Sequence, residues 1–223
     1  MRAVAALVVL CLALSSVALG QPPRSEERPS VDDAKIKAFL DARRGTWRDL
    51  NVPESDGKLL YKLIVDNQYK DIVEIGTSTG HSTIWLAWAA SKTGGKVTTI
   101  EIDEGRHRQA VANLTEAGLK EYVDARLGDA HQIVKDLKGP FDFVFSDADK
   151  EWYKNYFVDL YPKLKDGGCF TAHNVAMRRG GWGGSPSRSA TSYTLTVTNS
   201  QVRSPRSATG ARMRMARAPL RTL

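Results

Sequence analysis

The chain has 223 residues, 42% of them hydrophobic, which is enough for one domain with a real core plus extensions. Its formal net charge of +7 is misleading, because residues 1–166 hold 9 arginines and 14 lysines against 25 acidic residues, a balance of −2, whereas residues 167–223 hold 9 arginines and no acidic residue. The basicity therefore belongs to the C-terminal segment, and it gives no reason to regard the preceding domain as a nucleic-acid-binding one.

Residues 1–20 have the pattern of a secretory signal peptide. Arg2 precedes a short apolar run, and small residues occupy the −3 and −1 positions of a cleavage site before Gln21. We therefore expect a secreted or periplasmic protein without an integral membrane span after cleavage; the alternative is an uncleaved membrane anchor, and protease accessibility in intact cells distinguishes the two. Cleavage leaves one cysteine, Cys169, so no intrachain disulfide is expected, and we interpret Cys169 as a buried packing residue.

A polar, proline-rich linker at 21–31 precedes the predicted domain at 32–176. Apolar residues at helical spacing predict two helices, at 32–44 and 55–67. Beyond them, strands alternate with helices. The strands are expected at 71–75, 96–102, 122–127, 141–145 and 168–172, and the helices at 80–92, 104–118, 129–138 and 150–163. This alternation with short connections predicts an α/β fold, a doubly wound and mostly parallel sheet with helices on both faces.

The segment 177–223 differs from the domain in composition. It is rich in Ser, Thr, Arg, Ala and Gly, it lacks acidic residues and lysines, and only residues 191–198 alternate as a strand does. Two explanations stay open: a natural basic tail, or translation in a shifted reading frame. We favour the shift, because the composition breaks where the sheet still needs closing strands, which we expect to be atypical or missing. Resequencing the coding DNA tests this hypothesis.

Polar clusters follow all five predicted strands, at residues 74–80, 101, 128–129, 147–150 and 173–174. The carboxyl ends of parallel strands share one edge of the sheet, where ligands bind in such folds. A glycine-bearing turn after the first strand brings backbone close to a ligand, and an acid at the tip of the second strand, Glu101, suits two ribose hydroxyls. The spacing Glu-x-Gly-x-x-x-Gly from Glu74 to Gly80 favours S-adenosylmethionine over a dinucleotide, so a nicotinamide dehydrogenase is disfavoured.

Residues 50–174 resemble the cation-dependent O-methyltransferases, the family that includes the catechol and caffeoyl-coenzyme A enzymes. Three motifs carry the resemblance: residues 50–57 (Leu-Asn-Val-Pro-Glu-Ser-Asp-Gly), 73–82 (Val-Glu-Ile-Gly-Thr-Ser-Thr-Gly-His-Ser) and 143–150 (Phe-Val-Phe-Ser-Asp-Ala-Asp-Lys). The resemblance implies a class I methyltransferase fold, which is Rossmann-like, with S-adenosylmethionine and a divalent metal as cofactors. It also implies a small catechol-like aromatic hydroxyl substrate, and it suggests a homodimer.

The same resemblance implies roles for single residues. Lys150 lies at the reacting hydroxyl, where it takes or shares the proton. Ser82 holds the methionine carboxylate at the start of a helix, where unpaired N–H groups favour an anion. The residues assigned to the cofactor are Val52, Glu74, Gly76, Thr77, Ser82, Glu101, Ala130 and Asp149. His131 follows Ala130 directly, and we interpret it as a polar residue of a first helical turn.

The resemblance places a metal at Asp147, His173 and Asn174, but His173 stands where the family normally has an aspartate. Three oxygen ligands suit magnesium or calcium, whereas an imidazole favours manganese, zinc or iron. Two interpretations stay open, namely a softer metal or a weak or absent metal site.

Two further functions remain as alternatives. The altered metal position and the unusual tail are consistent with an S-adenosylmethionine-binding protein that does not catalyse transfer. The Arg-rich tail could instead bind an anionic surface, although its few aromatic residues predict no specific nucleic-acid recognition. Trp85 and Trp88 lie three residues apart on one helix and are expected in the core. Trp152 and Tyr153 are expected either to border an aromatic substrate or to pack a helix on the sheet.

Overall fold

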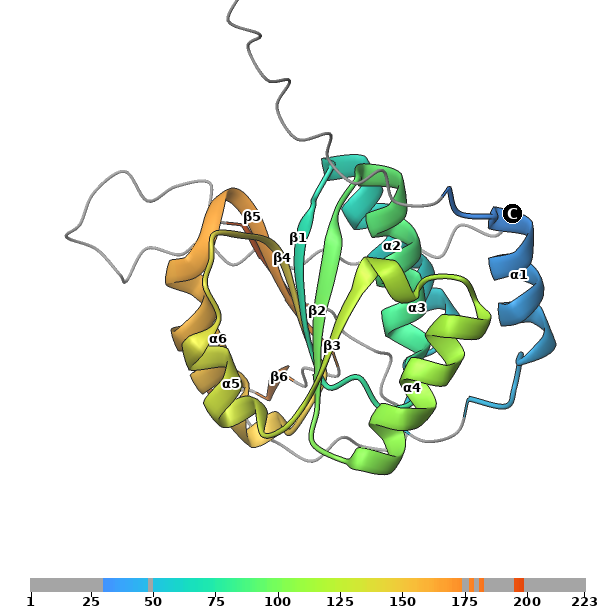
Figure 1. The fold of residues 1–223 in the computed structure, drawn as a ribbon. Helices are drawn as coiled ribbons and strands as arrows, with labels where there is room; N and C mark the ends of the chain where they lie inside the picture. Colours follow the sequence, from blue (N-terminus) through green and yellow to red (C-terminus); the bar gives the residue numbers. More distant parts are fainter. Residues whose placement is uncertain (1–29, 48–49, 174–176, 179–180, 183–194, 199–223) are drawn as a thin grey trace, which may run out of the picture.

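The computed structural model describes residues 30–47, 50–173, 177–178, 181–182 and 195–198. Its centre is a six-stranded sheet in the order β3-β2-β1-β4-β5-β8 (Figure 1). The five parallel strands are β1 (Asp71–Ile75), β2 (Lys96–Glu101), β3 (Val123–Leu127), β4 (Phe141–Ser146) and β5 (Leu164–Ala172). The chain order reverses between β1 and β4, which is the place where doubly wound sheets bind their ligands.

Helices cover both faces of the sheet, as the sequence predicted. In Figure 1, α5 and α6 lie on one face, α2, α3 and α4 lie on the other, and α1 lies outside that second layer. The helices are α1 (Asp33–Ala42), α2 (Glu54–Asn67), α3 (His81–Thr93), α4 (Glu104–Glu116), α5 (Ala130–Asp136) and α6 (Tyr153–Leu160). Short 3-10 helices occur at Lys120–Tyr122, Lys150–Trp152 and Tyr161–Lys163.

The single helix predicted over 150–163 is wrong in detail, because the segment divides into a 3-10 turn, α6 and a second 3-10 turn. Pro162 lies in the second turn, and proline lacks the N–H that continues an α-helix. The helix proper therefore ends at Leu160. Elsewhere the predicted helix and strand ends differ from the observed ones by a few residues.

Two apolar clusters form the core, one on each face of the sheet. Neighbouring residues of a strand point to opposite faces, so Ile72 joins the cluster under α2 and α3 while Val73 joins the cluster under α5 and α6. Because both faces are covered, β1 is buried from its second residue onward. Cys169 is also buried, and Trp85 and Trp88 are each 6% exposed in the first cluster, so all three packing predictions are confirmed.

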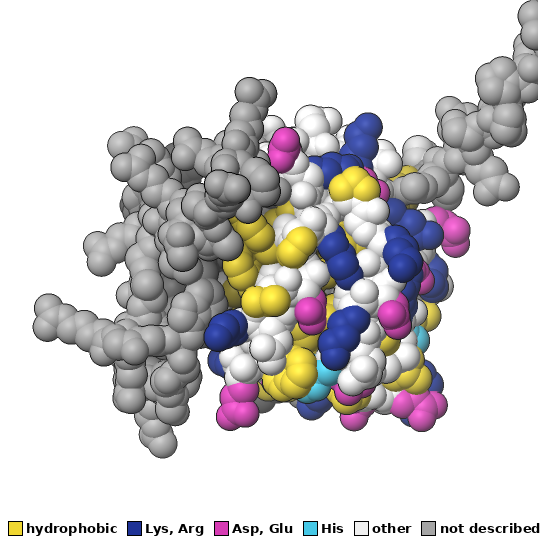
Figure 2. All heavy atoms as spheres, turned by 90° about the vertical axis from the view of Figure 1, so that its left-hand side faces the viewer, with side chains coloured by type: hydrophobic (Ala, Val, Ile, Leu, Met, Phe, Trp, Pro, Cys, Tyr) yellow, Lys and Arg dark blue, Asp and Glu magenta, His cyan; other side chains and the backbone are white. Residues whose placement is uncertain are grey.

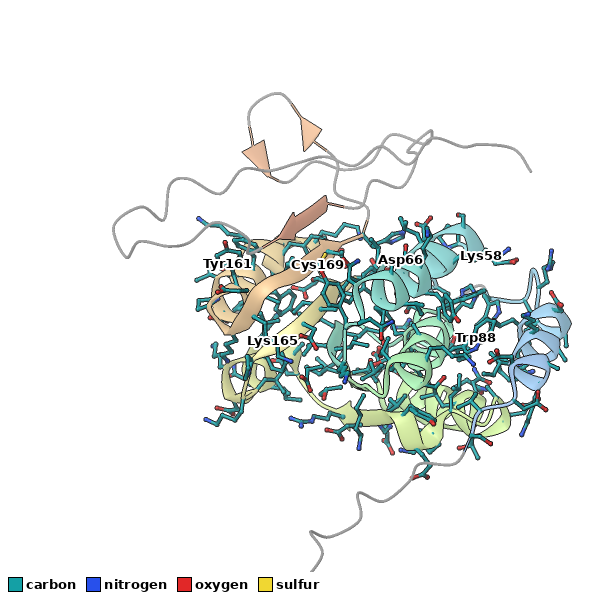
Figure 3. The ribbon with its side chains drawn as sticks, turned by 90° about the horizontal axis from the view of Figure 1, so that it is seen from above. Lys58, Asp66, Trp88, Tyr161, Lys165 and Cys169 are labelled. Carbon is teal, nitrogen blue, oxygen red and sulfur yellow. The ribbon has the colours of Figure 1, made fainter. Side chains whose placement is uncertain are left out.

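The helices α2 and α3 pack closely because a glycine faces a tryptophan. A Cβ atom at Gly57 of α2 would lie 2.2 Å from the Trp85 ring of α3. On the outer side of α3, the indole Nε1 of Trp88 donates a hydrogen bond of 2.8 Å to Asp33 at the start of α1 (Figure 3). These two contacts fix the N-terminal helices to α3, and α2 is the helix that carries part of the site described below.

The C-terminal segment contributes β8 (Leu195–Thr198), which pairs antiparallel with β5. The strand expected within 191–198 is therefore present and gives the sheet one closing strand. β6 (Met177–Arg178) and β7 (Gly181–Trp182) form a separate two-stranded sheet. The predicted signal peptide at 1–20, and most of the linker and the tail, lie outside the described residues.

Two surface observations bear on membranes and nucleic acid. Among the described residues, none of the helices is long and apolar enough to cross a membrane. On the face formed by α5 and α6, Lys and Arg side chains are interspersed with Asp and Glu side chains (Figure 2). This mixed pattern is typical of a solvated surface rather than of a face that attracts a polyanion.

Candidate functional site

A cavity of about 610 Å³ lies at the carboxyl ends of the parallel strands. Each of the five strands contributes lining residues from the loop that follows it: Gly76 after β1, Glu101 at the end of β2, residues 128–131 after β3, residues 147–150 after β4 and His173 after β5. The polar clusters that the sequence placed at these strand ends therefore do meet in one cavity.

The turn after β1 requires glycine at position 76. Gly76 has φ of +94°, and a Cβ atom there would lie 2.8 Å from the backbone oxygen of Asp147. Its N–H donates to the carbonyl of Ile100 at 3.0 Å. The turn is therefore held between β2 and the loop after β4, and a side chain at this position would push that loop away. The result is bare backbone at the wall of the cavity.

Glu101 is held in a fixed orientation by backbone donors. Its Oε2 accepts from the N–H of Ser78 at 2.7 Å, and its Oε1 accepts from the N–H of Asp103 at 2.9 Å. The side chain is 6% exposed and lines the cavity. Each carboxylate oxygen can accept a second hydrogen bond, so this arrangement suits a ligand with two neighbouring hydroxyls.

Asp149, in the loop after β4, lines another part of the cavity wall and lies in a small aromatic cluster. Tyr156 donates its hydroxyl proton to Oδ1 at 2.7 Å, and His131 Nε2 donates to Oδ2 at 3.0 Å. The His131 ring stacks on Trp152, with 3.7 Å between the ring centroids. Burial and the carboxylate of Asp149 raise the pKa of Tyr156, so its hydroxyl remains a donor. His131 was interpreted as only a polar first-turn residue; it also lines the cavity, so that interpretation was too narrow.

Lys150 lines the same wall, close to the carboxylate of Asp147. Its Nζ lies 3.7 Å from Asp147 Oδ1 and 3.5 Å from the hydroxyl of Tyr153. Tyr153 in turn donates to the backbone oxygen of His173 at 2.9 Å. Burial, together with the charge of Asp147, raises the pKa of Tyr153, so this hydroxyl is neutral and can donate. Tyr153 is 4% exposed, which favours its packing role over contact with a substrate.

His173 lies between two carboxylates, one predicted and one missed. Its Nε2 is 2.8 Å from Oδ2 of Asp56 in α2, and its Nδ1 is 3.1 Å from Oδ2 of Asp147. The second contact is an ion-pair contact, and the buried Nδ1 makes no geometrically regular hydrogen bond with the described residues. Burial by itself lowers the pKa of His173, but Asp147 and Asp56 outweigh it and raise the pKa to about 9.

Four of the residues assigned to the cofactor lie behind the cavity wall. Val52, Glu74, Thr77 and Ser82 are between 0% and 5% exposed and do not line the cavity. Glu74 Oε2 accepts from Thr83 at 2.5 Å and Thr99 at 2.6 Å, and the Ser82 hydroxyl also bonds to this carboxyl group. Burial raises the pKa of Glu74 to about 7. These residues form a buried layer under the glycine turn, and their direct contact with a cofactor stays a prediction.

Other lining residues were not anticipated. Leu50 and Ile102 are 73% and 68% exposed and give the cavity mouth an apolar rim, while Asn51 and Arg106 add polar groups. Leu50 and Asn51 begin a quoted motif without having been assigned a role, and nothing in the sequence marks Ile102, because exposed aliphatic side chains are common. Asn174 lies outside the described residues, and within those residues no group of three His, Cys, Asp or Glu side chains could hold a metal.

A doubly wound sheet with an acid at the tip of β2 and a glycine turn after β1 defines an α/β protein that binds a nucleoside-containing ligand. The model of the O-methyltransferase family matches residues 29–200, and the chain belongs to this family.

The comparisons with single proteins agree with that family. The chain is 36% identical over 148 residues to a catechol O-methyltransferase from Niastella koreensis, covering 65% of this chain and 66% of the relative. It resembles the crystal structure of the O-methyltransferase TomG from Streptomyces achromogenes, involved in tomaymycin synthesis and in complex with S-adenosylmethionine, with a TM-score of 0.55, 35% identity, and 64% and 66% of the two chains covered.

A similar likeness holds for the O-methyltransferase from Bacillus cereus in complex with S-adenosylhomocysteine, with a TM-score of 0.55, 32% identity, and 64% and 67% of the two chains covered. The region matched in the Niastella relative is 66% of its length, so the chain spans slightly less than two thirds of that protein.

Proposed function

We propose that the chain is an S-adenosylmethionine-dependent O-methyltransferase that transfers a methyl group to a hydroxyl of a small catechol-like aromatic, assisted by a divalent metal. The observation that carries the proposal is that Glu101 and the pair Asp147 and Lys150 line one cavity. A site for a ribose and a site for a reacting hydroxyl thus lie within reach of one bound cofactor. The family membership and the cofactor complexes of the structural relatives support this function.

Different residues of the cavity bind different parts of the cofactor. Glu101, fixed by two backbone N–H groups, accepts from the two ribose hydroxyls. Ala130, at the start of α5, is assigned to the adenine side, and Asp149, which also lines the cavity, is assigned a contact with the cofactor. The apolar rim at Leu50 and Ile102 covers the uncharged part of the nucleoside and excludes water from it.

Asp147 and His173 are two donor side chains that would hold the metal ion in this proposal. The buried Nδ1 of His173 makes no geometrically regular hydrogen bond with the described residues and lies 3.1 Å from a carboxylate oxygen of Asp147; in the neutral ring both atoms would carry lone pairs for a metal. With Asn174 the donor set contains a carboxylate, an imidazole and an amide oxygen, which favours manganese, iron or zinc over magnesium. A metal ion held there supplies Lewis acidity, which lowers the pKa of a catechol hydroxyl.

Methyl transfer is an in-line displacement in which the substrate oxygen attacks the methyl carbon, the carbon–sulfur bond breaks, and S-adenosylhomocysteine leaves. The protein contributes orientation and removal of the hydroxyl proton. Lys150 takes or shares that proton, and its Nζ is kept near the reacting group by Asp147 Oδ1 at 3.7 Å and Tyr153 at 3.5 Å. No other described lysine lines the cavity.

The test is a calorimetric titration of the full chain with S-adenosylmethionine, followed by a turnover assay with catechol and a panel of divalent metals. We expect Asp147→Ala and Lys150→Ala each to abolish transfer, while Lys150→Ala retains cofactor binding. Turnover in Lys150→Ala would remove the base assignment. A well-folded wild type that takes up no cofactor under any ionic condition would refute the function, and cofactor uptake without turnover would assign a binding protein instead.

A further inference from the structure

We propose that Asp56 is a positioning residue, which holds His173 so that Nδ1, together with Asp147, faces a transition-metal ion. The inference rests on the metal in the proposed function and deepens it, because it adds a residue to the three metal positions (Asp147, His173 and Asn174) and specifies a class of metal. Asp56 comes from helix α2, whereas His173 follows β5, and the two are 117 residues apart in the sequence.

The geometry places the two carboxylates on opposite nitrogens of one ring. Asp56 Oδ2 lies 2.8 Å from Nε2, and Asp147 Oδ2 lies 3.1 Å from Nδ1. The side chains of His173, Asp147 and Asp56 are 5%, 12% and 18% exposed, so water screens these contacts little. Asp56 is fixed by the close packing of α2 on α3 at Gly57, the next residue in the chain.

The contact with Asp56 determines which nitrogen can bind a metal. A carboxylate only accepts hydrogen bonds, so Nε2 must carry the proton that Asp56 receives. In the neutral ring the lone pair is then on Nδ1, which is buried and has no hydrogen-bond donor beside it. A histidine that ligates a metal through one nitrogen and donates the other N–H to a carboxylate is a common arrangement in metal sites.

The space between His173 Nδ1 and the carboxylate of Asp147 is a place where a positive charge would be stabilised. Nδ1 and Asp147 Oδ2 are 3.1 Å apart, and in the neutral ring both atoms carry lone pairs. A metal ion would take the place of the proton that the charged ring carries on Nδ1. Two ligands that are each about 2.1 Å from one ion and at right angles to each other stand about 3 Å apart. The spacing therefore allows two neighbouring ligands of one ion, and it equally allows a proton between the two atoms when no ion is bound.

The ligand set has a consequence for the identity of the metal. Imidazole binds manganese, iron, cobalt and zinc well, whereas magnesium and calcium require oxygen ligands. Because Asp56 also increases the basicity of the ring, its removal is expected to weaken metal binding about 10- to 100-fold.

The experiment is a manganese titration of the full chain, followed by electron paramagnetic resonance in the absence of cofactor and substrate. We expect wild type to bind manganese with a nitrogen coupling in its pulsed spectrum, and Asp56→Asn to weaken binding about 10- to 100-fold. The matched control is Asp66→Asn, which lies at the other end of α2, pairs with Lys62 at 2.6 Å on the surface (Figure 3) and is expected to leave manganese binding unchanged.

A second background separates positioning from a purely structural role. In His173→Asp the ligands are all oxygen, so the nitrogen coupling should vanish and magnesium should compete better with manganese. Asp56 then faces another carboxylate, and adding Asp56→Asn should no longer weaken manganese binding. If Asp56→Asn weakened manganese binding equally in the wild-type chain and in His173→Asp, the proposal would be overturned.

Two other results would also overturn it. They are a wild type that takes up no manganese, and an Asp56→Asn variant that loses thermal stability but keeps its manganese affinity, which would make the three residues a structural ion cluster. The proposed methyl transfer fails in a different way. If manganese binds with a nitrogen coupling but no methyl group is transferred, the transfer is refuted and the role of Asp56 stands. If methyl transfer proceeds in the presence of a chelator and no manganese is taken up, the transfer stands and the role of Asp56 is refuted.

Discussion

The buried carboxyl group of Glu74 makes the stability of this fold depend on pH in a direction that can be tested. Glu74 is 0% exposed, its Oε2 accepts from Thr83 and Thr99, and its Oε1 has no hydrogen-bond partner among the described residues. Burial outweighs these hydrogen bonds and raises the pKa from 4.5 to about 7. The folded protein therefore binds this proton more tightly than the unfolded chain does.

The sign and size of the effect follow from that difference. Between pH 4.5 and about 7 the unfolded chain has lost the proton while the folded protein keeps it, so raising the pH favours unfolding. Each pKa unit corresponds to about 1.4 kcal/mol, and the difference between the two pKa values therefore costs about 3 kcal/mol by pH 7. Above that pH both states have lost the proton, and this contribution becomes constant.

The assay compares wild type with Glu74→Gln by urea unfolding at pH 5, 6, 7 and 8. We expect the free energy of unfolding of wild type to fall by about 2–3 kcal/mol more than that of the variant over this range, because part of the full effect lies below pH 5. At pH 5 the variant should be the less stable by about 1–3 kcal/mol, because its amide N–H group replaces an oxygen that has no partner. Parallel curves for the two proteins would refute the reasoning.

Two further predictions concern the packing of the N-terminal helices. Gly57→Ala places a Cβ atom 2.2 Å from the Trp85 ring, so α2 must move away from α3. We expect the free energy of unfolding to fall by about 1–3 kcal/mol, measured as a lower melting temperature. An unchanged melting temperature would contradict the close packing. Trp88→Phe removes the hydrogen bond to Asp33 and should lower the free energy of unfolding in urea by about 1 kcal/mol. In a chain that already carries Asp33→Ala, the same substitution should lower it by less.

The sequence predicted the parallel sheet and its ligand edge because those depend on local patterns. The strand Asp71–Ile75 is a short apolar run that ends in glycine, and Glu101 ends the next run, so both positions follow from strand length and turn chemistry. Parallel strands then place all the carboxyl ends together whatever the side-chain packing is. That is why a set of residues scattered over a hundred positions could be assigned to one cavity.

The missed residues are those whose role depends on how two elements are rotated against each other. Asp56 reaches His173 only because α2 packs on α3 at Gly57, and no local pattern encodes that contact over 117 residues. Likewise, His131 is directed into the cavity by stacking on Trp152 from another segment. Sequence reasoning placed each of these residues on its element but could not determine the direction of its side chain.

The residues assigned to the cofactor by resemblance separate into two groups that the motif itself does not distinguish. Gly76, Glu101, Ala130 and Asp149 line the cavity, whereas the other four are buried behind it. Three of the buried residues are connected: Thr77 Oγ1 lies 2.5 Å from Thr99 Oγ1, Thr99 donates to Glu74, and the Ser82 hydroxyl bonds to the same carboxyl group. A change in Glu74 therefore reaches a ligand through the turn at Gly76 and must alter stability and binding together, while a change in a lining side chain can alter binding with a smaller effect on stability.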